Sequence, residues 1–278
     1  MCATCGCSSG GVRVLTVGHG HGHGQRHPHP HLSDHEHDHD HEHQREFTDV
    51  HVVPAGPEGE RTIELQQKVL AKNDQLAADN RQWLHERGIL AVNLMSSPGA
   101  GKTTLLERTT RDLSSKIAIS VVEGDQETAL DASRMLRAGS KVVQINTGAG
   151  CHLDAQMLAR GLRSLNPPAG SIVMIENVGN LVCPALFDLG EQARVVLAST
   201  TEGTDKPLKY PHMFRQADLV LLNKIDLLPY IDFDIREYAC GLRKVTPDAL
   251  LLQLSATTGD GMDAWYDWLR RRTPVPPD

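Results

Sequence analysis

The sequence is poor in aromatic residues and has no long hydrophobic run. Phe, Trp and Tyr together make up 4% of the chain, and no stretch approaches the ~18 consecutive apolar residues of a membrane-spanning helix. The start of the chain also lacks the cationic segment and apolar run of a secretory signal. Scarce aromatic rings and the absence of a basic footprint argue against nucleic-acid binding. We therefore expect a cytoplasmic protein that binds neither a membrane nor nucleic acid.

The first 60 residues contain no lysine and few large apolar side chains. They hold 12 of the 15 histidines, three of the six cysteines, and nine acidic residues against three arginines. Such a segment cannot bury enough apolar surface to offset the entropy lost on ordering. We expect residues 1–60 to be a disordered Cys/His-rich metal-binding tail, and residues 61–278 to be one domain with a sizeable core.

Short apolar runs alternate with helical patterns along the domain. The runs are 89–95, 117–122, 142–145, 172–175, 195–198, 219–222 and 250–254. The helical patterns are 62–87, where Leu70, Ala77 and Leu84 recur every seven residues, 103–113, 129–138, 153–165, 233–243 and 262–271. Runs that are apolar throughout predict an α/β fold with a predominantly parallel sheet of about seven strands, flanked by helices. Ligands bind such sheets at the carboxyl ends of the strands.

The first run leads into a glycine-rich segment, SSPGAGKTT at 96–104, and then into a helical pattern. This order is typical of a P-loop, whose backbone N–H groups surround phosphate oxygens. We expect Lys102 to reach the β and γ phosphates and the Thr103 hydroxyl to bind Mg²⁺. One departure is Ser96, which replaces the usual first glycine. The expected phosphate-binding residues are Gly99, Ala100, Gly101, Lys102, Thr103 and Thr104.

A second motif, Asn223-Lys224-Ile225-Asp226, follows the run at 219–222. The Asp226 carboxylate can accept hydrogen bonds from two guanine donors that adenine lacks, which predicts GTP rather than ATP. The Lys224 stem can lie along the purine. The run at 250–254 leads into Ser255 and Ala256, whose backbone N–H groups we expect near the guanine O6.

Two acidic residues follow strands and complete the expected catalytic set. Asp125 follows the run at 117–122, and Glu176 follows the run at 172–175. Either carboxylate can hold Mg²⁺ or orient the attacking water, and the sequence does not decide between them. With Lys102, they are the predicted catalytic residues.

The beginning of the chain and its histidine tract favour metal binding. Cys2, Cys5 and Cys7 place three thiols within six residues, and residues 19–43 contain 11 histidines. Cysteines without a secretory signal indicate a reducing compartment, where thiols serve metals rather than disulfides. Three thiolates with the terminal amine could form a square plane for Ni²⁺, whereas Zn²⁺ prefers a tetrahedron. The histidines suit weak binding of several ions.

A third cysteine set lies inside the domain. Cys151 and His152 follow the run at 142–145, and Cys183 follows the strand that carries Glu176. We expect these three residues to bind Ni²⁺ or Zn²⁺ on the nucleotide side of the sheet, with a symmetric dimer supplying further ligands. Cys240, inside a helical pattern, is expected to pack in the core.

Together these motifs resemble the hydrogenase nickel-incorporation GTPase family, HypB. The resemblance rests on the cysteine start, the histidine tract, and the segments 96–104, 147–155, 176–184 and 223–226. It implies a slow GTPase of the class shared with signal-recognition-particle and urease-accessory GTPases, which forms a GTP-dependent homodimer. It also implies three partners: a hydrogenase large-subunit precursor, a companion nickel-delivery accessory protein, and a metallochaperone of the peptidyl-prolyl-isomerase type.

Two other functions remain open from the sequence. A nickel storage protein could carry the same tail with an inactive nucleotide site, and a urease-type GTPase could deliver nickel to a different client. A P-loop kinase for small molecules is disfavoured because Asn223–Asp226 selects guanine and no acceptor site is evident.

Overall fold

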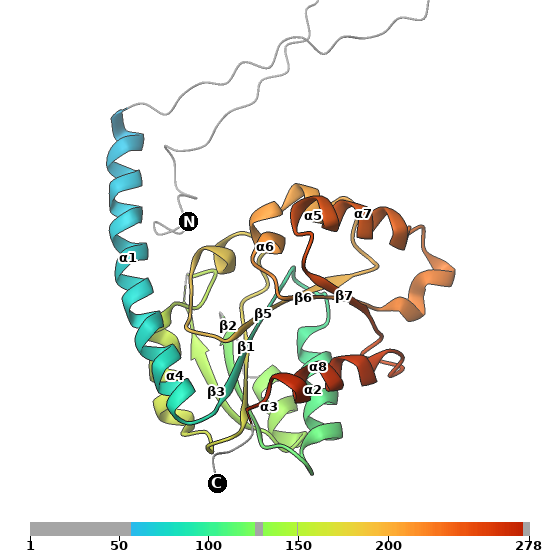
Figure 1. Ribbon diagram of the computed structural model, residues 1–278, viewed down its shortest axis with the longest axis horizontal. Helices are drawn as coiled ribbons and strands as arrows, with labels where there is room; N and C mark the ends of the chain where they lie inside the picture. Colours follow the sequence, from blue (N-terminus) through green and yellow to red (C-terminus); the bar gives the residue numbers. More distant parts are fainter. Residues whose placement is uncertain (1–56, 126–129, 149, 275–278) are drawn as a thin grey trace, which may run out of the picture.

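A central β-sheet with helices on both faces forms the body of the protein, and one long helix extends beyond it (Figure 1). The structure, a computed structural model, describes residues 57–125, 130–148 and 150–274. Within these ranges no helix is both long enough and apolar enough to cross a lipid bilayer. Residues 1–56 lie outside these ranges. The disorder of the tail and the domain boundary at residue 61 therefore remain predictions from the sequence.

All seven strands of the sheet run parallel, as the apolar runs predict. Their spatial order is β3-β2-β4-β1-β5-β6-β7. Strands β2, β4 and β1 are neighbours, so their carboxyl ends, and the residues that follow them, lie side by side. The strands are β1 (Leu90–Ser96), β2 (Ile119–Asp125), β3 (Lys141–Asn146), β4 (Ile172–Glu176), β5 (Ala193–Ser199), β6 (Leu219–Asn223) and β7 (Leu250–Gln253).

Each helical pattern corresponds to a helix, with shifted ends. The helices are α1 (Pro57–Glu86), α2 (Lys102–Leu113), α3 (Leu130–Arg137), α4 (Ala155–Leu165), α7 (Ile235–Val245) and α8 (Met262–Arg272). The sequence did not predict the short helices α5 (Lys206–Lys209), α6 (Pro211–Arg215), η1 (Cys183–Leu186) and η2 (Ile225–Tyr230). The Asp154 side chain caps α4 by accepting from the Met157 N–H at 2.7 Å. Leu153 therefore belongs to the preceding loop rather than to the helix.

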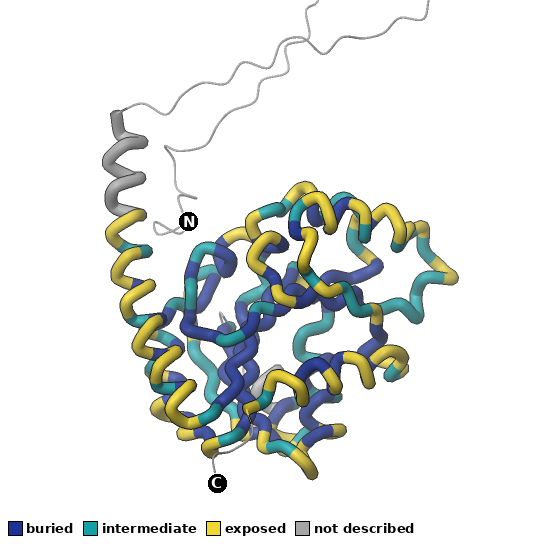
Figure 2. Tube along the Cα trace, viewed as in Figure 1, coloured by how far each residue is buried: buried dark blue, intermediate teal, exposed yellow. Residues whose placement is uncertain are grey.

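The core lies on both faces of the sheet (Figure 2). In β1, Val92 and Leu94 pack with α2 and α8, whereas Ala91 packs on the opposite face with α1 and α4. Helices α6 and α7 cover β5 and β6 on that second face. Because helices cover both faces, every position of a central strand is buried, which explains the continuous apolar runs.

Asparagines complete the buried face of α1. Ala77 and Leu84 are fully buried, as the seven-residue repeat suggested, and Asn73 and Asn80 are buried between and beside them. Asn80 Nδ2 donates to the carbonyl oxygens of Ala155 and Leu189 at 2.8 and 2.9 Å. These bonds satisfy the buried amide, so α1 is joined to the start of α4 and to the loop before β5 by polar contacts that apolar periodicity does not reveal.

The expectation for Cys240 was wrong. Its side chain is exposed on α7, because the buried face of that helix is formed by Tyr238, Gly241 and Leu242.

Candidate functional site

The loop between β1 and α2 has the conformation of a phosphate-binding loop. Gly99 and Gly101 have φ angles of 73° and 103°, in the left-handed region that glycine adopts without strain. Helix α2 begins at Lys102, immediately after this loop. The N–H groups at the start of a helix point toward its N-terminal end, and together with the helix dipole they favour an anion at this position.

Asn223 joins this loop to the segments expected to recognise the base. Its Nδ2 donates to the carbonyl oxygen of Ala100 at 2.9 Å, and its Oδ1 accepts from the Ala256 N–H at 3.0 Å. The approach is close, because a Cβ on Gly101 would lie 2.6 Å from Asn223 Nδ2. Both this contact and the positive φ require glycine at position 101. The structure therefore brings the three predicted nucleotide motifs together at one edge of the sheet.

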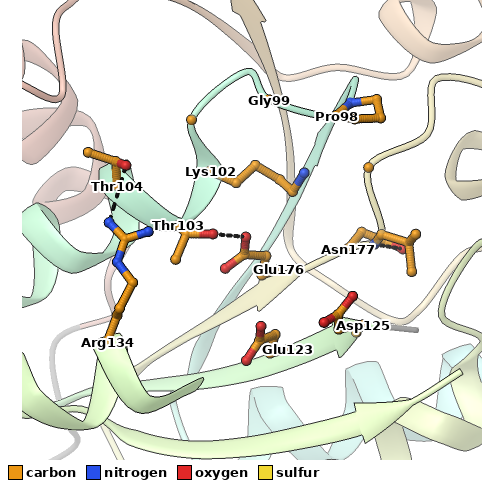
Figure 3. A pocket seen from close by; sticks show the side chains of 14 residues that line it. Pro98, Gly99, Lys102, Thr103, Thr104, Glu123, Asp125, Arg134, Glu176 and Asn177 are labelled. Carbon is orange, nitrogen blue, oxygen red and sulfur yellow. Dashed lines mark hydrogen bonds between the residues drawn. The ribbon is translucent and has the colours of Figure 1, made fainter. Parts of the chain in front are cut away.

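Lys102 and Thr103 lie close to the ends of β1 and β4 (Figure 3). Lys102 Nζ donates to Ser96 Oγ at 2.8 Å, and Thr103 Oγ1 donates to Glu176 Oε1 at 2.8 Å. Ser96, the residue that departs from the usual P-loop pattern, thus gives the lysine amine an acceptor inside the loop.

A cavity of about 440 Å³ lies beside these residues. Its walls are Pro98, Gly99, Gly101, Lys102, Thr103, Thr104, Glu123, Gly124, Asp125, Arg134, Glu176, Asn177, Val178 and Gly179. The predicted residues Lys102, Asp125 and Glu176 therefore share one cavity, whose volume and polar walls suit a small anionic ligand with a cation.

Three carboxylates line the cavity, one more than the sequence analysis identified. Glu123 lies on β2 beside Glu176 on β4, and both are almost fully buried. Carboxylates grouped in a shielded site repel one another unless cations share them, and carboxylate oxygens are the ligands that Mg²⁺ prefers. Alternation along β2 could have identified Glu123, because residues two apart, such as Glu123 and Asp125, share a strand face.

Arg134 and Asn177 are the other polar wall residues that the sequence analysis missed. The Arg134 guanidinium forms an ion pair with Glu107 at 2.8 Å and donates to Thr104 Oγ1 at 3.4 Å. Asn177 directly follows Glu176 in the segment 176–184. Its position next to a predicted catalytic residue could have identified it as a residue of the cavity wall. No pattern in the sequence singles out Arg134.

The expected base site has an acceptor ready for a ligand. Asp226 Oδ1 is buried, and no other described residue donates a hydrogen bond to it. A buried carboxylate oxygen without a donor is costly, so the position fits a base with N–H groups. Lys224 has a φ of 64°, and its Nζ donates to the Gly99 carbonyl oxygen at 2.8 Å.

The backbone amides expected near the guanine O6 already have partners. The Ser255 N–H donates to the Asp260 carbonyl oxygen at 2.8 Å, and the Ala256 N–H donates to Asn223 Oδ1 at 3.0 Å. In this structure the Ala256 N–H therefore supports Asn223 of the neighbouring motif, and the Ser255 N–H closes its own loop on Asp260.

Cys151, His152 and Cys183 form a compact cluster of metal-binding groups. Their candidate ligand atoms all lie within 4.8 Å of one another, and Cys151 Sγ is 3.8 Å from His152 Nδ1. Cys151 and His152 come from the loop between β3 and α4, and Cys183 starts η1 after β4. Two thiols and an imidazole are the donor set for Zn²⁺, Ni²⁺ or a similar borderline ion.

The surroundings of His152 favour its metal-binding form. Its ring stacks on Phe187 with centroids 3.9 Å apart. Burial lowers the pKa of the His152 imidazole below its ordinary value, and the Asp154 carboxylate opposes this shift. A lowered pKa keeps the ring neutral near pH 7, and the neutral imidazole is the form that binds a metal.

The predicted tail ligands Cys2, Cys5 and Cys7, and the histidine tract at 19–43, lie outside the described residues.

Comparison with known proteins identifies the family of this chain. Residues 90–253 match the model of the family described as CobW/HypB/UreG, nucleotide-binding domain. The chain is 52% identical over 220 residues to the hydrogenase maturation factor HypB of Rhizobium leguminosarum bv. viciae, which covers 79% of this chain and 73% of that protein. The crystal structure of HypB from Archaeoglobus fulgidus matches with a TM-score of 0.69 and 40% identity, over 74% of this chain and 100% of that chain. HypB from Helicobacter pylori in complex with nickel matches with a TM-score of 0.68 and 35% identity, over 74% and 99%. The chain therefore belongs to the HypB family of hydrogenase maturation factors.

Proposed function

We propose that this protein hydrolyses GTP to GDP and phosphate with Mg²⁺, and uses this cycle to deliver nickel into the large-subunit precursor of a hydrogenase. The observation that carries the proposal is that one segment, residues 176–183, takes part in both sites. Residues 176–179 line the phosphate cavity, and Cys183, shortly after them, contributes a thiol to the cysteine–histidine cluster. A segment shared by two sites allows occupancy of one to change affinity at the other.

The phosphate end of the cavity supplies the catalytic groups. The Lys102 amine would neutralise charge on the β and γ phosphates, supported by the N–H groups of residues 99–104. Thr103 with Asp125 or Glu176 would hold Mg²⁺, which would add charge neutralisation there. The carboxylate that does not bind the ion would orient the attacking water. We expect slow turnover, as the family resemblance implies.

Guanine would be recognised by the Asn223–Asp226 motif. The Asp226 carboxylate would accept from guanine N1–H and the exocyclic amine, and the Lys224 stem would lie along the ring. Asn223 would hold the motif against the phosphate loop, supported by its bond from the Ala256 N–H.

The cysteine–histidine cluster would hold the metal during delivery. One subunit offers two thiols and one imidazole, one donor fewer than a tetrahedral site requires. A GTP-dependent homodimer that pairs two clusters across its two-fold axis would supply the missing ligands. Both Ni²⁺ and Zn²⁺ suit these donors.

The names of the relatives, rather than the geometry, support the choice of client. The related proteins are named hydrogenase maturation factors, and one was solved with nickel. We therefore propose a hydrogenase large-subunit precursor as client, with a companion nickel-delivery protein and a peptidyl-prolyl-isomerase-type metallochaperone as partners. Delivery to a precursor would take place in the cytoplasm, where the three described cysteines, which form no disulfide, remain reduced.

Nickel content of the hydrogenase tests this function in the host cell. Loss of the protein should leave the large subunit without nickel, and the wild-type chain should restore it, whereas Lys102→Ala should not. Restoration by both chains would instead indicate a nickel store that does not need GTP turnover. A change in the nickel content of urease, with hydrogenase unaffected, would indicate a urease-type client.

We expect nucleotide state to change metal affinity at the cysteine–histidine cluster. The protein for this test is the full chain with Cys2, Cys5, Cys7 and Cys240 replaced by serine, so that thiolate-to-nickel absorption reports only the cluster. Nickel titrations in GDP and in a non-hydrolysable GTP analogue should differ by about 1–3 kcal/mol, the usual range of allosteric coupling. Replacing Cys151 and Cys183 with alanine should remove the absorption. Equal affinities in both nucleotides would show that the cluster is not a switch site.

The cysteine start and the histidine tract should bind metal differently. Three thiols at short fixed spacing should hold one ion tightly, whereas 11 loosely spaced imidazoles should bind several ions weakly. Deleting residues 19–43 should therefore lower the nickel stoichiometry in equilibrium dialysis and leave the tight site intact. Loss of the tight site would mean that histidines form it.

A further inference from the structure

The loop that carries Cys151 and His152 is held from two sides. On the nucleotide side, the Leu153 N–H donates to Asn177 Oδ1 at 3.2 Å. On the α1 side, the Ala155 N–H donates to Asn73 Oδ1 at 2.9 Å. Two buried asparagines thus bind neighbouring amides of one short segment, but only Asn177 also lines the phosphate cavity.

The Asn177 amide is fixed in one orientation. It is 1% exposed, and its Oδ1 also accepts from the Val178 N–H at 3.0 Å (Figure 3). Its Nδ2 donates to Asn93 Oδ1 at 3.3 Å, and Asn93 Nδ2 donates to Glu191 Oε1 at 3.2 Å. Turning this amide would leave buried groups without partners, which is costly. If the carboxyl end of β4 is displaced, Asn177 Oδ1 should therefore move with it and displace the Leu153 backbone to which it is hydrogen-bonded.

Leu153 also contacts the second strand that lines the cavity. Its side chain is fully buried, and a Cβ on Gly124 would lie 2.6 Å from Leu153 Cγ. Gly124 lies between the carboxylates of Glu123 and Asp125. Because close-packed interiors transmit displacement rather than absorb it, the residue next to His152 is sensitive to both acidic strand ends.

We propose that Asn177 is a positioning residue that transmits the nucleotide state to the metal ligands. Its hydrogen bond to Leu153 links the Glu176 end of β4 to the loop that carries Cys151 and His152. Cys183 follows Asn177 along the same segment, so one displacement would change the geometry of all three ligands. This inference rests on the proposed function, since it requires GTP and nickel to bind at these two sites.

A pair of matched variants tests the inference in the full chain with the four serine replacements described above. Asn177→Ala and Asn73→Ala each remove one buried side-chain bond to residues 153–155, so both should lower the thermal unfolding midpoint. The measured quantity is the ratio of nickel dissociation constants in GDP and in a non-hydrolysable GTP analogue. We expect a ratio of about 5–150-fold in the parent and in Asn73→Ala, and a ratio near one in Asn177→Ala.

A conservative variant separates positioning from folding. Asn177→Asp keeps an oxygen that can accept from the Leu153 N–H but loses the donor to Asn93 Oδ1, so its ratio should lie between that of the parent and that of Asn177→Ala. Parent-like coupling in Asn177→Ala would overturn the role of Asn177 while leaving the coupled delivery mechanism in place. A ratio of one in the parent would overturn both. GTP hydrolysis and total nickel binding, measured on the same samples, would show whether the GTPase site and the metal site are each functional.

Discussion

Replacing Lys102 with alanine is expected to abolish measurable GTP turnover, with kcat reduced by at least ~10²–10³-fold. Removing one preorganised donor from a phosphoryl or oxyanion site typically has an effect of this size, and Lys102 also carries a full positive charge into a cavity lined by three carboxylates. Without that charge the phosphates would face Glu123, Asp125 and Glu176 with less compensation. Phosphate release under saturating GTP and Mg²⁺ measures the effect.

Lys116→Ala is the matched control for this variant, because Lys116 is exposed in the connection between α2 and β2. It should hydrolyse GTP as the wild type does. Tight nickel binding at the cysteine start should survive in Lys102→Ala, because we expect the thiols to form a site of their own at the other end of the sequence, whereas Lys102 Nζ donates to Ser96 Oγ in the loop between β1 and α2. Equal turnover by Lys102→Ala and wild type would exclude the loop as the catalytic site.

Replacing Asp226 with asparagine should change base specificity from guanine toward xanthine. Two charge-assisted hydrogen bonds to guanine would be lost, at about 1.5–3 kcal/mol each, which corresponds to a loss of GTP affinity of ~10²-fold or more. The asparagine amide can instead donate to the oxo group that xanthine carries in place of the amine. Competition between GTP and xanthosine triphosphate for a fluorescent nucleotide measures the change.

Asp232→Asn is the control for charge, because it removes one exposed carboxylate from the same loop region. Its preference for GTP should equal that of the wild type. An Asp226→Asn variant that still prefers GTP over xanthosine triphosphate would rule out Asp226 as the base-recognising residue. A loss of both nucleotides would instead indicate damage to the motif, which thermal unfolding would reveal.

Much of the fold could be predicted from the sequence because its signals are local. A strand covered on both faces is apolar throughout, and each of the seven runs corresponds to one parallel strand. Glycines before Lys102 and the tetrad ending at Asp226 are short motifs whose chemistry depends on neighbours in the chain. The side of the sheet on which they meet follows from the rule for carboxyl ends of parallel strands.

Other features depended on which segments become neighbours in space. Asn80 carries no apolar signal, yet it fills the buried face of α1, because its amide reaches carbonyls of Ala155 and Leu189. Cys240 lies in a helical pattern but faces outward. The amides of Ser255 and Ala256 have protein partners that no local pattern indicates.

The sequence by itself determined the seven strands, the glycine-rich segment 96–104, the tetrad 223–226, and the placement of Cys151, His152 and Cys183 beyond the carboxyl ends of β3 and β4. Only the tertiary structure decided that β4 lies between β2 and β1, that Glu123 joins Asp125 and Glu176, and that Asn177 reaches Leu153. The physical reason is that hydrophobic periodicity specifies which residues are buried but not which strand lies beside which. Hydrogen bonds between residues far apart in the chain form only when strand order and close packing bring their polar atoms within reach.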